Sequence, residues 1–356
     1  MRLAYVTSRY PPHTGGVETH VSELASRFAA RGHEVTVLSA DAGTRVDGVR
    51  VARSERRDGV RVRRFRGIAP GGAFHVAPGI APAVRRVDAD LVHAHNYHSL
   101  PLLFAALGTS SGLPLVATPH YHGGSASDLR DRLLGAYRPL GEWALRRARA
   151  VVAVSEWERR RLAADFGVEA TVIPNGLDVA RFRDAEPVER ERPYLLCVGR
   201  LEAYKGVQHV VGALPALTDP PYDLLVAGAG PYGDDLRRIA REAGVGDRVS
   251  FLGYVPDEEL PGLYAGASAF VTMSGFEAYG MTVAEALASG TPCVVRPAGA
   301  LVDWTRRADC VAADVDEVAA GVRTAVGLAA PSDSLPAWED VVERTGTVYE
   351  GVLDGR

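Results

Sequence analysis

Short apolar runs that lead into glycine-containing turns are the feature that most constrains the fold of this chain. Residues 3–7 form such a run without the alternation of a half-exposed strand, and residues 269–272 form another. Strands of this kind belong to sheets that are covered on both faces. The first run leads through a turn containing Gly15 and Gly16 into a helical pattern and then a second strand. This unit predicts an α/β fold with parallel sheets.

The same pattern occurs twice along the chain. In the first half we expect strands at 3–7, 35–38, 90–95, 115–118, 151–155 and 171–173, and in the second half at 194–198, 223–227, 249–253, 269–272, 293–295 and 310–312. A polar, proline-flanked linker near residues 183–193 separates the halves. We therefore predict two Rossmann-like domains, 1–183 and 184–335. A final helix at 336–356 is expected to pack back on the first domain.

The composition restricts where the protein works and what it binds. The 356 residues are enough for two hydrophobic cores, and the formal net charge of −4 gives no indication of a nucleic-acid partner. No apolar run approaches the length of a membrane span. The three cysteines lack metal-ligand spacing, so free thiols in a reducing cytoplasm are expected.

Residues 45–66 contain nine arginines. We interpret them as solvated side chains on strands. Peripheral contact with the inner face of a membrane, or with an anionic acceptor, is the alternative.

Two carboxylates lie in the segment from Met273 to Pro292. Glu277 is in a turn, and Glu285 lies eight positions later in a small apolar helix. A salt bridge to an arginine would satisfy Glu285. Alternatively, both carboxylates accept hydrogen bonds from ligand hydroxyls, while the main-chain N–H groups of residues 279–282 face a phosphate. Hydroxyls on either side of phosphates describe a nucleotide sugar.

Two cations follow the first strand of the second half. Arg200 and Lys205 precede a helix, and Lys205 is the only lysine in the chain. Both follow the carboxyl end of a strand, where their two fixed positive charges would stabilise a bound diphosphate. Surface ion pairs with Glu202 are the alternative. In the first half, the Gly15-Gly16 turn suits a phosphate at a helix N-terminus, although it lacks dinucleotide-binding spacing.

Histidines collect at strand ends in the first half. His93, His95, His120 and His122 suggest a metal site, but no carboxylate or cysteine joins them at ligand spacing. We therefore predict no metal site and no cofactor.

Taken together, these residues resemble glycosyltransferase family 4, retaining nucleotide-sugar transferases with the GT-B fold, in which two Rossmann-like domains face a central cleft. The matching elements span residues 15 to about 295 in the expected order. They are Gly15-Gly16-Val17-Glu18, Thr118-Pro119-His120, Val154-Ser155-Glu156, Pro174-Asn175-Gly176-Leu177-Asp178, Gly199-Arg200 with Lys205-Gly206, Gly228-Ala229-Gly230-Pro231, and Glu277 with Glu285.

The resemblance implies a role for each site residue. Arg200 and Lys205 would bind the donor diphosphate and stabilise the leaving group, and Glu285 would bind the ribose. His120 would lie against the transferred sugar. The catalytic residues that it implies are Arg200, Lys205, Glu277 and His120. The donor-binding residues that it implies are Gly15, Gly16, Gly199, Gly253, Tyr254, Val255, Ala278, Tyr279, Gly280, Met281, Thr282 and Glu285.

The resemblance also implies the reaction. A hexose-type sugar would pass from a UDP- or GDP-sugar to an acceptor hydroxyl without an essential metal, in envelope glycan, glycolipid or glycosylated-metabolite synthesis. The chain would bind the donor and an unknown glycan, lipid-linked or small-molecule acceptor, and no nucleic acid. A nucleotide-sugar epimerase of the same fold and a catalytically silent binding protein are the alternatives.

Overall fold

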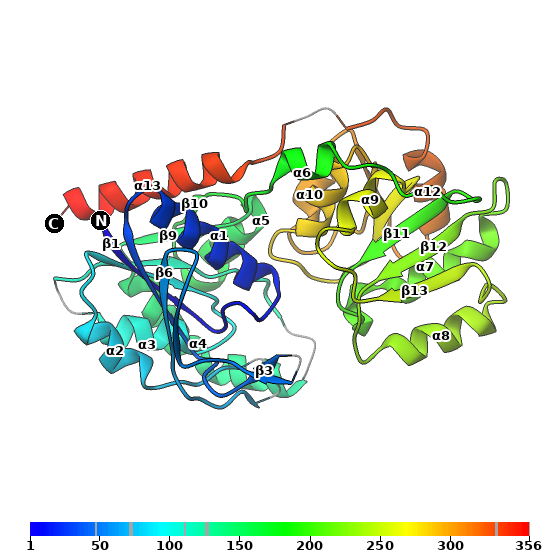
Figure 1. Cartoon of the computed structure of the whole chain (residues 1–356). Coiled ribbons are helices and arrows are strands. Elements are labelled where there is room, and N and C mark those ends of the chain that lie inside the picture. Colours follow the sequence, from blue (N-terminus) through cyan, green and yellow to red (C-terminus); the bar gives the residue numbers. More distant parts are fainter. Residues whose placement is uncertain (47, 71–73, 110–111, 125–127, 332–333, 356) are drawn as a thin grey trace. The chain divides into compact units, whose positions relative to one another are not determined.

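The computed structural model describes residues 1–355 apart from 47, 71–73, 110–111, 125–127 and 332–333. It divides the chain into two compact units, Met1–Gly176 with Trp338–Arg356, and Leu177–Ala337 (Figure 1). Residues 47 and 356 of the predicted segments 45–66 and 336–356 lie outside the described residues. None of the described helices is long and apolar enough to cross a membrane.

The first unit is built on a sheet with the strand order β10-β9-β8-β7-β1-β2-β6-β5, in which only the β5–β6 pair is antiparallel. Its strands are β1 (Arg2–Thr7), β2 (Glu34–Ser39), β5 (Ser54–Arg57), β6 (Val60–Arg64), β7 (Leu91–His95), β8 (Leu115–Thr118), β9 (Ala150–Ala153) and β10 (Thr171–Val172). A separate hairpin joins β3 (Arg45–Val46) to β4 (Val49–Arg50).

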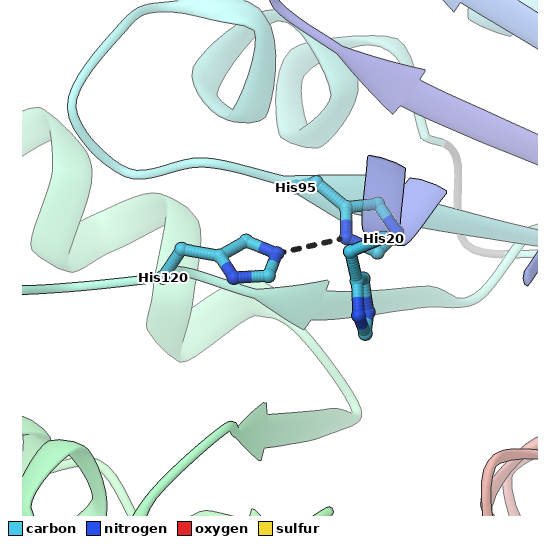
Figure 2. A group of neighbouring side chains, drawn as sticks. All are labelled: His20, His95 and His120. Carbon is cyan, nitrogen blue, oxygen red and sulfur yellow. Dashed lines mark hydrogen bonds between the residues drawn. The ribbon is translucent and has the colours of Figure 1, made fainter. Parts of the chain in front are cut away.

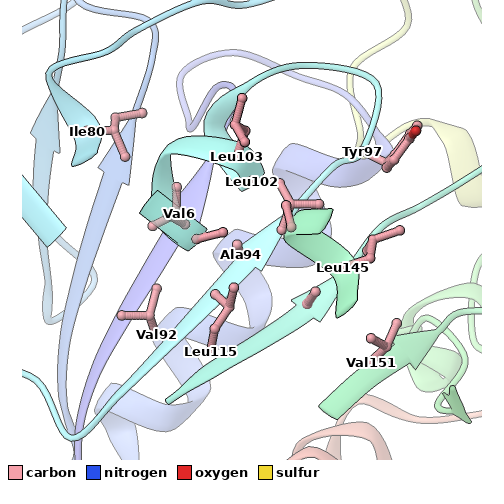
Figure 3. Packing of buried hydrophobic residues seen from close by; sticks show 14 of the residues in the cluster. Val6, Ile80, Val92, Ala94, Tyr97, Leu102, Leu103, Leu115, Leu145 and Val151 are labelled. Atoms are coloured by element: carbon pink, nitrogen blue, oxygen red, sulfur yellow. The ribbon is translucent and has the colours of Figure 1, made fainter. Parts of the chain in front are cut away.

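Both faces of this sheet are buried under helices. On β1, Ala4 and Val6 join one apolar cluster, whereas Leu3 and Tyr5 join another. Figure 3 shows part of the first cluster, with Val6 near the apolar side chains of β7 and of the covering helices. Helices on the first face are α2 (Ile80–Arg86), α3 (Pro101–Gly108), α4 (Asp128–Arg147) and α5 (Glu156–Phe166). The opposite cluster includes side chains of α1 (Gly16–Ala30) and α13 (Trp338–Asp354).

The final helix, α13, is part of the first unit. It packs beside α1, and its residues Trp338, Val342 and Tyr349 are buried in the shared core (Figure 1). The Tyr349 hydroxyl lies 2.9 Å from the Tyr5 hydroxyl. Thus, burial of its apolar face holds this C-terminal segment on the N-terminal sheet.

The predicted domain boundary at residue 183 falls at the end of α6 (Val179–Arg183), which belongs to the second unit. Its residue Phe182 is buried and makes a ring contact with Tyr264 of α9 (Leu260–Ala265). The first unit therefore ends at Gly176, before this helix, because the apolar side of α6 packs inside the second core.

One arginine of the 45–66 segment is not solvated as we predicted. Arg64 is buried at the end of β6, where it lies 3.3 Å from Asp41 and 2.6 Å from Glu55. On β6 it follows the buried Val60 and Val62 at two-residue spacing. Side chains two apart share one face of a strand, which directs Arg64 into the unit. Arg57 is half-buried, and the other seven arginines are exposed.

The second unit is a wholly parallel sheet with the order β13-β12-β11-β14-β15-β16. Its strands are β11 (Tyr194–Val198), β12 (Asp223–Ala227), β13 (Val249–Gly253), β14 (Ala269–Thr272), β15 (Cys293–Val295) and β16 (Cys310–Ala312). The helices are α6, α7 (Val207–Ala213), α8 (Gly233–Glu242), α9, α10 (Met281–Ala288), α11 (Leu301–Trp304) and α12 (Val318–Ala325), with 3₁₀ turns η2 (Ala203–Lys205) and η3 (Leu214–Ala216). Both units are therefore α/β layers with Rossmann-like parallel sheets.

Candidate functional site

In the second unit, the main chains that follow β11, β12 and β13 lie close together at the carboxyl ends of these neighbouring strands. The Gly228 N–H donates to the Gly253 carbonyl at 2.7 Å. A Cβ atom at Gly228 would lie 1.9 Å from the Gly199 carbonyl oxygen, so this position requires glycine. By contrast, a Cβ at Gly199 would meet nothing within 4 Å. The sheet edge beside Gly199 is therefore open backbone, as a ligand at the carboxyl end of a parallel sheet requires.

A pocket at this edge brings together five of the predicted site residues, Gly199, Arg200, Lys205, Glu277 and Thr282. They come from the turn after β11, from η2 and from the segment after β14. Apolar side chains of the strands, including Val226 and Val271, form the rest of the lining.

Lys205 and Glu277 form the central charge pair of this pocket. The Lys205 Nζ donates to Glu277 Oε1 at 2.5 Å, and about four-fifths of each side chain is shielded from solvent. Burial lowers the pKa of Lys205, but the Glu277 carboxylate and Tyr204 together raise it by more, so the net result is a raised pKa. Lys205 is therefore a fixed positive charge at neutral pH, and a phosphate bound to it would lie beside Glu277.

Arg200 makes the surface pair that we considered as its alternative. Its Nη1 lies 3.0 Å from Glu202, and its Nη2 donates to the Tyr204 hydroxyl at 3.1 Å. The side chain is 66% exposed, although the residue also lines the pocket. Because an exposed pair of this kind is worth little, Arg200 is free to turn toward an anion in the pocket.

The N-terminus of helix α10 is positioned by a turn that ends at Gly280. Gly280 caps the helix at φ +98°, and a Cβ there would lie 2.8 Å from Leu301 Cδ2. The Trp304 indole N–H donates to the Tyr279 carbonyl at 2.6 Å, which holds the turn in place. The Val283 N–H donates to the Gly280 carbonyl at 3.0 Å. The N–H groups of Met281 and Thr282, at the start of the helix, are the ones available to an anion. Of the predicted residues in this turn, Ala278, Tyr279, Gly280 and Met281 do not line the pocket.

Glu285 lies on α10 away from the lining of this pocket. The Tyr264 hydroxyl donates to its Oε2 at 2.8 Å. Among the described residues, no arginine or lysine forms a salt bridge with it, so the salt-bridge alternative is not what the structure contains. Burial raises the pKa of Glu285, against a lowering by the Tyr264 hydrogen bond.

The predicted base-reading segment, Gly253 to Val255, lies at a second pocket. Tyr254 and Val255 line it together with Arg181, Pro256 and other residues, and Tyr254 is 68% exposed. The Gly253 carbonyl is already used by Gly228. Only the side chains and remaining main-chain groups of this segment are available to a ligand.

In the first unit, α1 begins directly after Gly15, at Gly16. The side chain of Glu18 folds back on this terminus, so that a Cβ at Gly15 would lie 2.4 Å from its Oε2. Glu18 is buried and lies 2.8 Å from the Arg9 guanidinium. Consequently, an anion at this helix N-terminus would share the site with a carboxylate that Arg9 neutralises.

His120 follows β8 in a left-handed conformation, with φ +48°, and is buried. It belongs to a group with His95, at the end of β7, and His20 of α1 (Figure 2). Sequence reasoning missed His20, because in the sequence it lies within a helix and not at the end of a strand. The other two histidines that we considered, His93 and His122, are not part of this group. His93 is hydrogen-bonded to Tyr349 and Thr118, and His122 stacks on His98.

Sequence reasoning also missed Glu158, which supports the turn carrying His120. Its carboxylate is buried and accepts main-chain hydrogen bonds from Tyr121 at 2.5 Å and from Val154 at 2.6 Å. Burial raises the pKa of Glu158 to about 8, although both hydrogen bonds oppose the shift. One side chain thus joins the loops after β8 and β9. Its position two residues after the Val154-Ser155-Glu156 motif was the available signal.

Comparison with known proteins assigns each half to a sugar-transferase model. Residues 14–181 match the model described as Glycosyltransferase Family 4, and residues 178–326 match Glycosyl transferases group 1. The chain is 32% identical over 359 residues to a glycogen synthase of Mycobacterium tuberculosis, covering 91% of this chain and 86% of that protein.

Two further proteins extend the comparison. A GDP-mannose-dependent alpha-(1-6)-phosphatidylinositol monomannoside mannosyltransferase of the same species is 30% identical over 333 residues, which cover 84% of this chain and 81% of that protein. The solved structure of a sucrose-phosphate synthase from Thermosynechococcus elongatus matches with a TM-score of 0.77 at 20% identity, covering 100% of both chains. The latter establishes the fold, which is of the GT-B type.

Proposed function

This chain belongs to glycosyltransferase family 4, and from that premise we propose that it moves a hexose-type sugar from a nucleotide-sugar donor to an acceptor hydroxyl. The chain is a glycosyltransferase of the hexosyltransferase type. The observation that carries the donor proposal is the pocket that unites Gly199, Arg200, Lys205 and Glu277 at the end of the second sheet.

Lys205 and Arg200 bind the donor diphosphate in this proposal. Negative charge grows on the departing nucleoside diphosphate as the bond to the sugar breaks, and fixed cations stabilise this charge more in the transition state than before it. The raised pKa of Lys205 keeps it charged throughout. The open N–H groups at the start of α10 supplement the two side chains.

The carboxylates bind the hydroxyl-bearing ends of the donor. Glu285 accepts from the ribose, and its hydrogen bond from Tyr264 holds the carboxylate in one orientation. Glu277 and the main chain from Ala278 to Gly280 bind the sugar. The segment from Gly253 to Val255 contacts the base, and the exposed ring of Tyr254 is suited to stacking.

We propose that the first unit contributes Gly15, Gly16 and His120 to the reaction and binds the acceptor. The transfer retains the anomeric configuration. The acceptor attacks from the face that the diphosphate leaves, and the departing phosphate takes up the acceptor proton. Protein cations supply the charge stabilisation, so no metal is essential. A UDP- or GDP-sugar is the donor.

An acceptor in envelope glycan, glycolipid or glycosylated-metabolite synthesis remains the proposal for the second substrate. The cytoplasmic location and membrane contact through the exposed arginines of residues 45–66 stay predictions. Vesicles containing anionic lipids test the contact. Co-sedimentation that disappears when the exposed arginines are replaced by glutamine would support it, whereas no co-sedimentation with unmodified protein would contradict it.

Incubation with single donors tests the transferase against the epimerase alternative. We expect UDP- or GDP-sugar to be slowly hydrolysed to free sugar and nucleoside diphosphate, and to be consumed faster when an acceptor is added. A changed nucleotide sugar with no released diphosphate would instead identify an epimerase. Binding of a donor without any turnover across an acceptor library would favour the silent binding protein.

A further inference from the structure

Three buried histidines from separate elements meet at the carboxyl edge of the first sheet. His20 comes from α1, His95 ends β7 and His120 follows β8. One ring nitrogen of each lies within 4.8 Å of the others (Figure 2). All three side chains are almost inaccessible to solvent, at 4%, 0% and 5%. No single strand or helix brings them together, so their meeting is a property of the tertiary fold.

The spacing of two of the nitrogens also suits two ligands of one ion. His95 Nδ1 lies 3.4 Å from His120 Nε2, which is long for the hydrogen bond drawn in Figure 2. A hydrogen bond from N–H spans about 2.7–3.2 Å. Two nitrogens bound to one tetrahedral Zn²⁺ at about 2.0–2.1 Å would be separated by about 3.3 Å. The observed spacing is close to that of two ligands sharing a metal.

A nitrogen of the third ring has no hydrogen-bond partner. His20 Nδ1 is buried without a hydrogen bond among the described residues. Unpaired buried polar atoms are uncommon and need an explanation. By comparison, His93, two residues before His95 on the same face of β7, is an ordinary core histidine. Its two ring nitrogens lie 2.6 Å from the Tyr349 hydroxyl and 2.7 Å from Thr118 Oγ1.

The burial of the group also suits a metal. Burial disfavours the protonated, charged form of an imidazole, and a metal binds the neutral ring. Three imidazoles without a carboxylate favour Zn²⁺ or a similar transition metal, whereas Mg²⁺ prefers oxygen ligands.

We propose that His20, His95 and His120 form a binding site for Zn²⁺ or a similar divalent transition metal, and that the bound ion inhibits sugar transfer. Three protein ligands leave one tetrahedral position for water. The inhibitory part rests on the proposed function, in which His120 contacts the donor sugar. A histidine that holds a metal through its nitrogen is no longer available to a sugar hydroxyl.

Binding is tested on the whole chain after its metals are removed with EDTA. Calorimetric titration with Zn²⁺ is expected to give one ion per chain, and titration with Mg²⁺ no binding. X-ray absorption of the zinc complex should show imidazole nitrogens at about 2.0–2.1 Å. Absence of zinc binding, or a ligand shell of oxygen or sulfur, would overturn the proposal without reference to any variant.

Variants then locate the ion. His20→Gln and His95→Gln should each weaken zinc binding at least 100-fold, while His98→Gln, at a half-buried histidine of the same unit, should leave it unchanged. Near-ultraviolet circular dichroism verifies that each variant is folded. Equal affinity in wild type and folded His20→Gln would refute this ligand set.

The inhibitory part is measured separately, as donor turnover with and without Zn²⁺. We expect inhibition in the wild type and in His98→Gln, and none in His20→Gln. Zinc binding with unchanged turnover would reject inhibition. If no nucleotide sugar is turned over by any form of the chain, the proposed function fails, and the calorimetric result still decides the metal site.

Discussion

Lys205 and Glu277 are the residues on which the chemistry of the donor pocket depends most. At 2.5 Å and largely shielded from solvent, they neutralise one another. Removing one partner of such a pair leaves the other charge unpaired, which costs more than the pair itself contributes. A phosphate that binds Lys205 therefore has to reorganise this pair, and the sugar hydroxyls that Glu277 is proposed to accept would compensate for the lost ammonium contact.

Glu285→Gln tests the carboxylate proposed for the ribose. Because burial raises the pKa of Glu285, the carboxylate becomes protonated at a higher pH than an ordinary glutamate as the solution is acidified. The protonated form accepts hydrogen bonds less well, so the donor KM of the wild type should rise as pH falls. Losing a charged hydrogen bond of about 1.5–3 kcal/mol predicts a donor KM roughly 10- to 150-fold higher in the variant at neutral pH.

The variant should also lose that pH dependence. The measurement is donor kcat/KM from about pH 5 to pH 8, with Glu242→Gln, at an exposed site on α8, as the control. If wild type and Glu285→Gln give superimposable profiles, Glu285 does not contact the donor.

For single residues, the sequence predicted which ones lie at the same sheet edge better than it predicted which side chains touch. The positions of Lys205 and Glu277 after parallel strands were enough to place both at one sheet edge, because the carboxyl ends of such strands meet there. The pairing of Lys205 with Glu277 was not predicted, since it depends on side-chain rotamers. His20 was missed because the rotation of α1 against the sheet decides which of its side chains reaches the strand ends.

Helix α10 illustrates how an element fixes the site. Its N-terminus is held by Gly280 in a left-handed conformation and by the bond from Trp304 to the Tyr279 carbonyl. The short apolar helix is buried along Val283, Ala284 and Leu287. Its orientation is therefore set by packing, and the open N–H groups of its first turn are held in position before any ligand binds.

Gly280→Ala should destabilise the chain for two reasons. The left-handed backbone costs about 1–3 kcal/mol for a residue with a side chain, and the new Cβ would crowd Leu301 Cδ2 at 2.8 Å. Gly290→Ala separates these effects, because Gly290 has φ +79° but its Cβ would meet nothing within 4 Å. Urea unfolding should show a larger loss for Gly280→Ala. Equal losses would mean that the crowding is relieved at no cost.

Helix α13 is held on the first unit by its apolar face. Val342 is fully buried in that core, so Val342→Ala should lower the free energy of unfolding by about 2 kcal/mol through lost burial and a cavity. Thr347→Ala, at an exposed position of the same helix, should change it by less than about 0.5 kcal/mol. Thermal unfolding measures both. A tolerated Val342→Ala would show that α13 contributes little to the stability of this unit.

Apolar runs and glycine turns predicted most strands of both sheets, because buried strands have few alternatives. The arginine-rich segment was harder. Its strand β6 joins the main sheet beside β2 and carries Arg64 into the interior. The alternation Val60, Val62, Arg64 indicated a common face, but the buried partners Asp41 and Glu55 lie on other segments and gave no local signal.

At the scale of the whole chain, two α/β units repeat one plan. The sequence predicted this duplication, the assignment to glycosyltransferase family 4 and the GT-B fold, all of which are confirmed. Many strands and turns along the chain carry the signal for these features, so misinterpreting any single residue does not change the prediction. The acceptor is encoded in loop side chains that follow no repeated pattern, and its identity therefore stays a proposal.

The donor pocket is tested most directly by calorimetric titration of UDP-, GDP- and ADP-sugars into the wild type, Lys205→Ala and Arg238→Ala. Arg238 is an exposed cation on α8 that pairs with Asp235 and Glu242, so its variant controls for loss of charge alone. We predict that at least one nucleotide sugar binds the wild type and Arg238→Ala equally, and binds Lys205→Ala at least 100-fold more weakly. Equal binding by folded Lys205→Ala, or no binding of any nucleotide sugar to the wild type, would contradict the account.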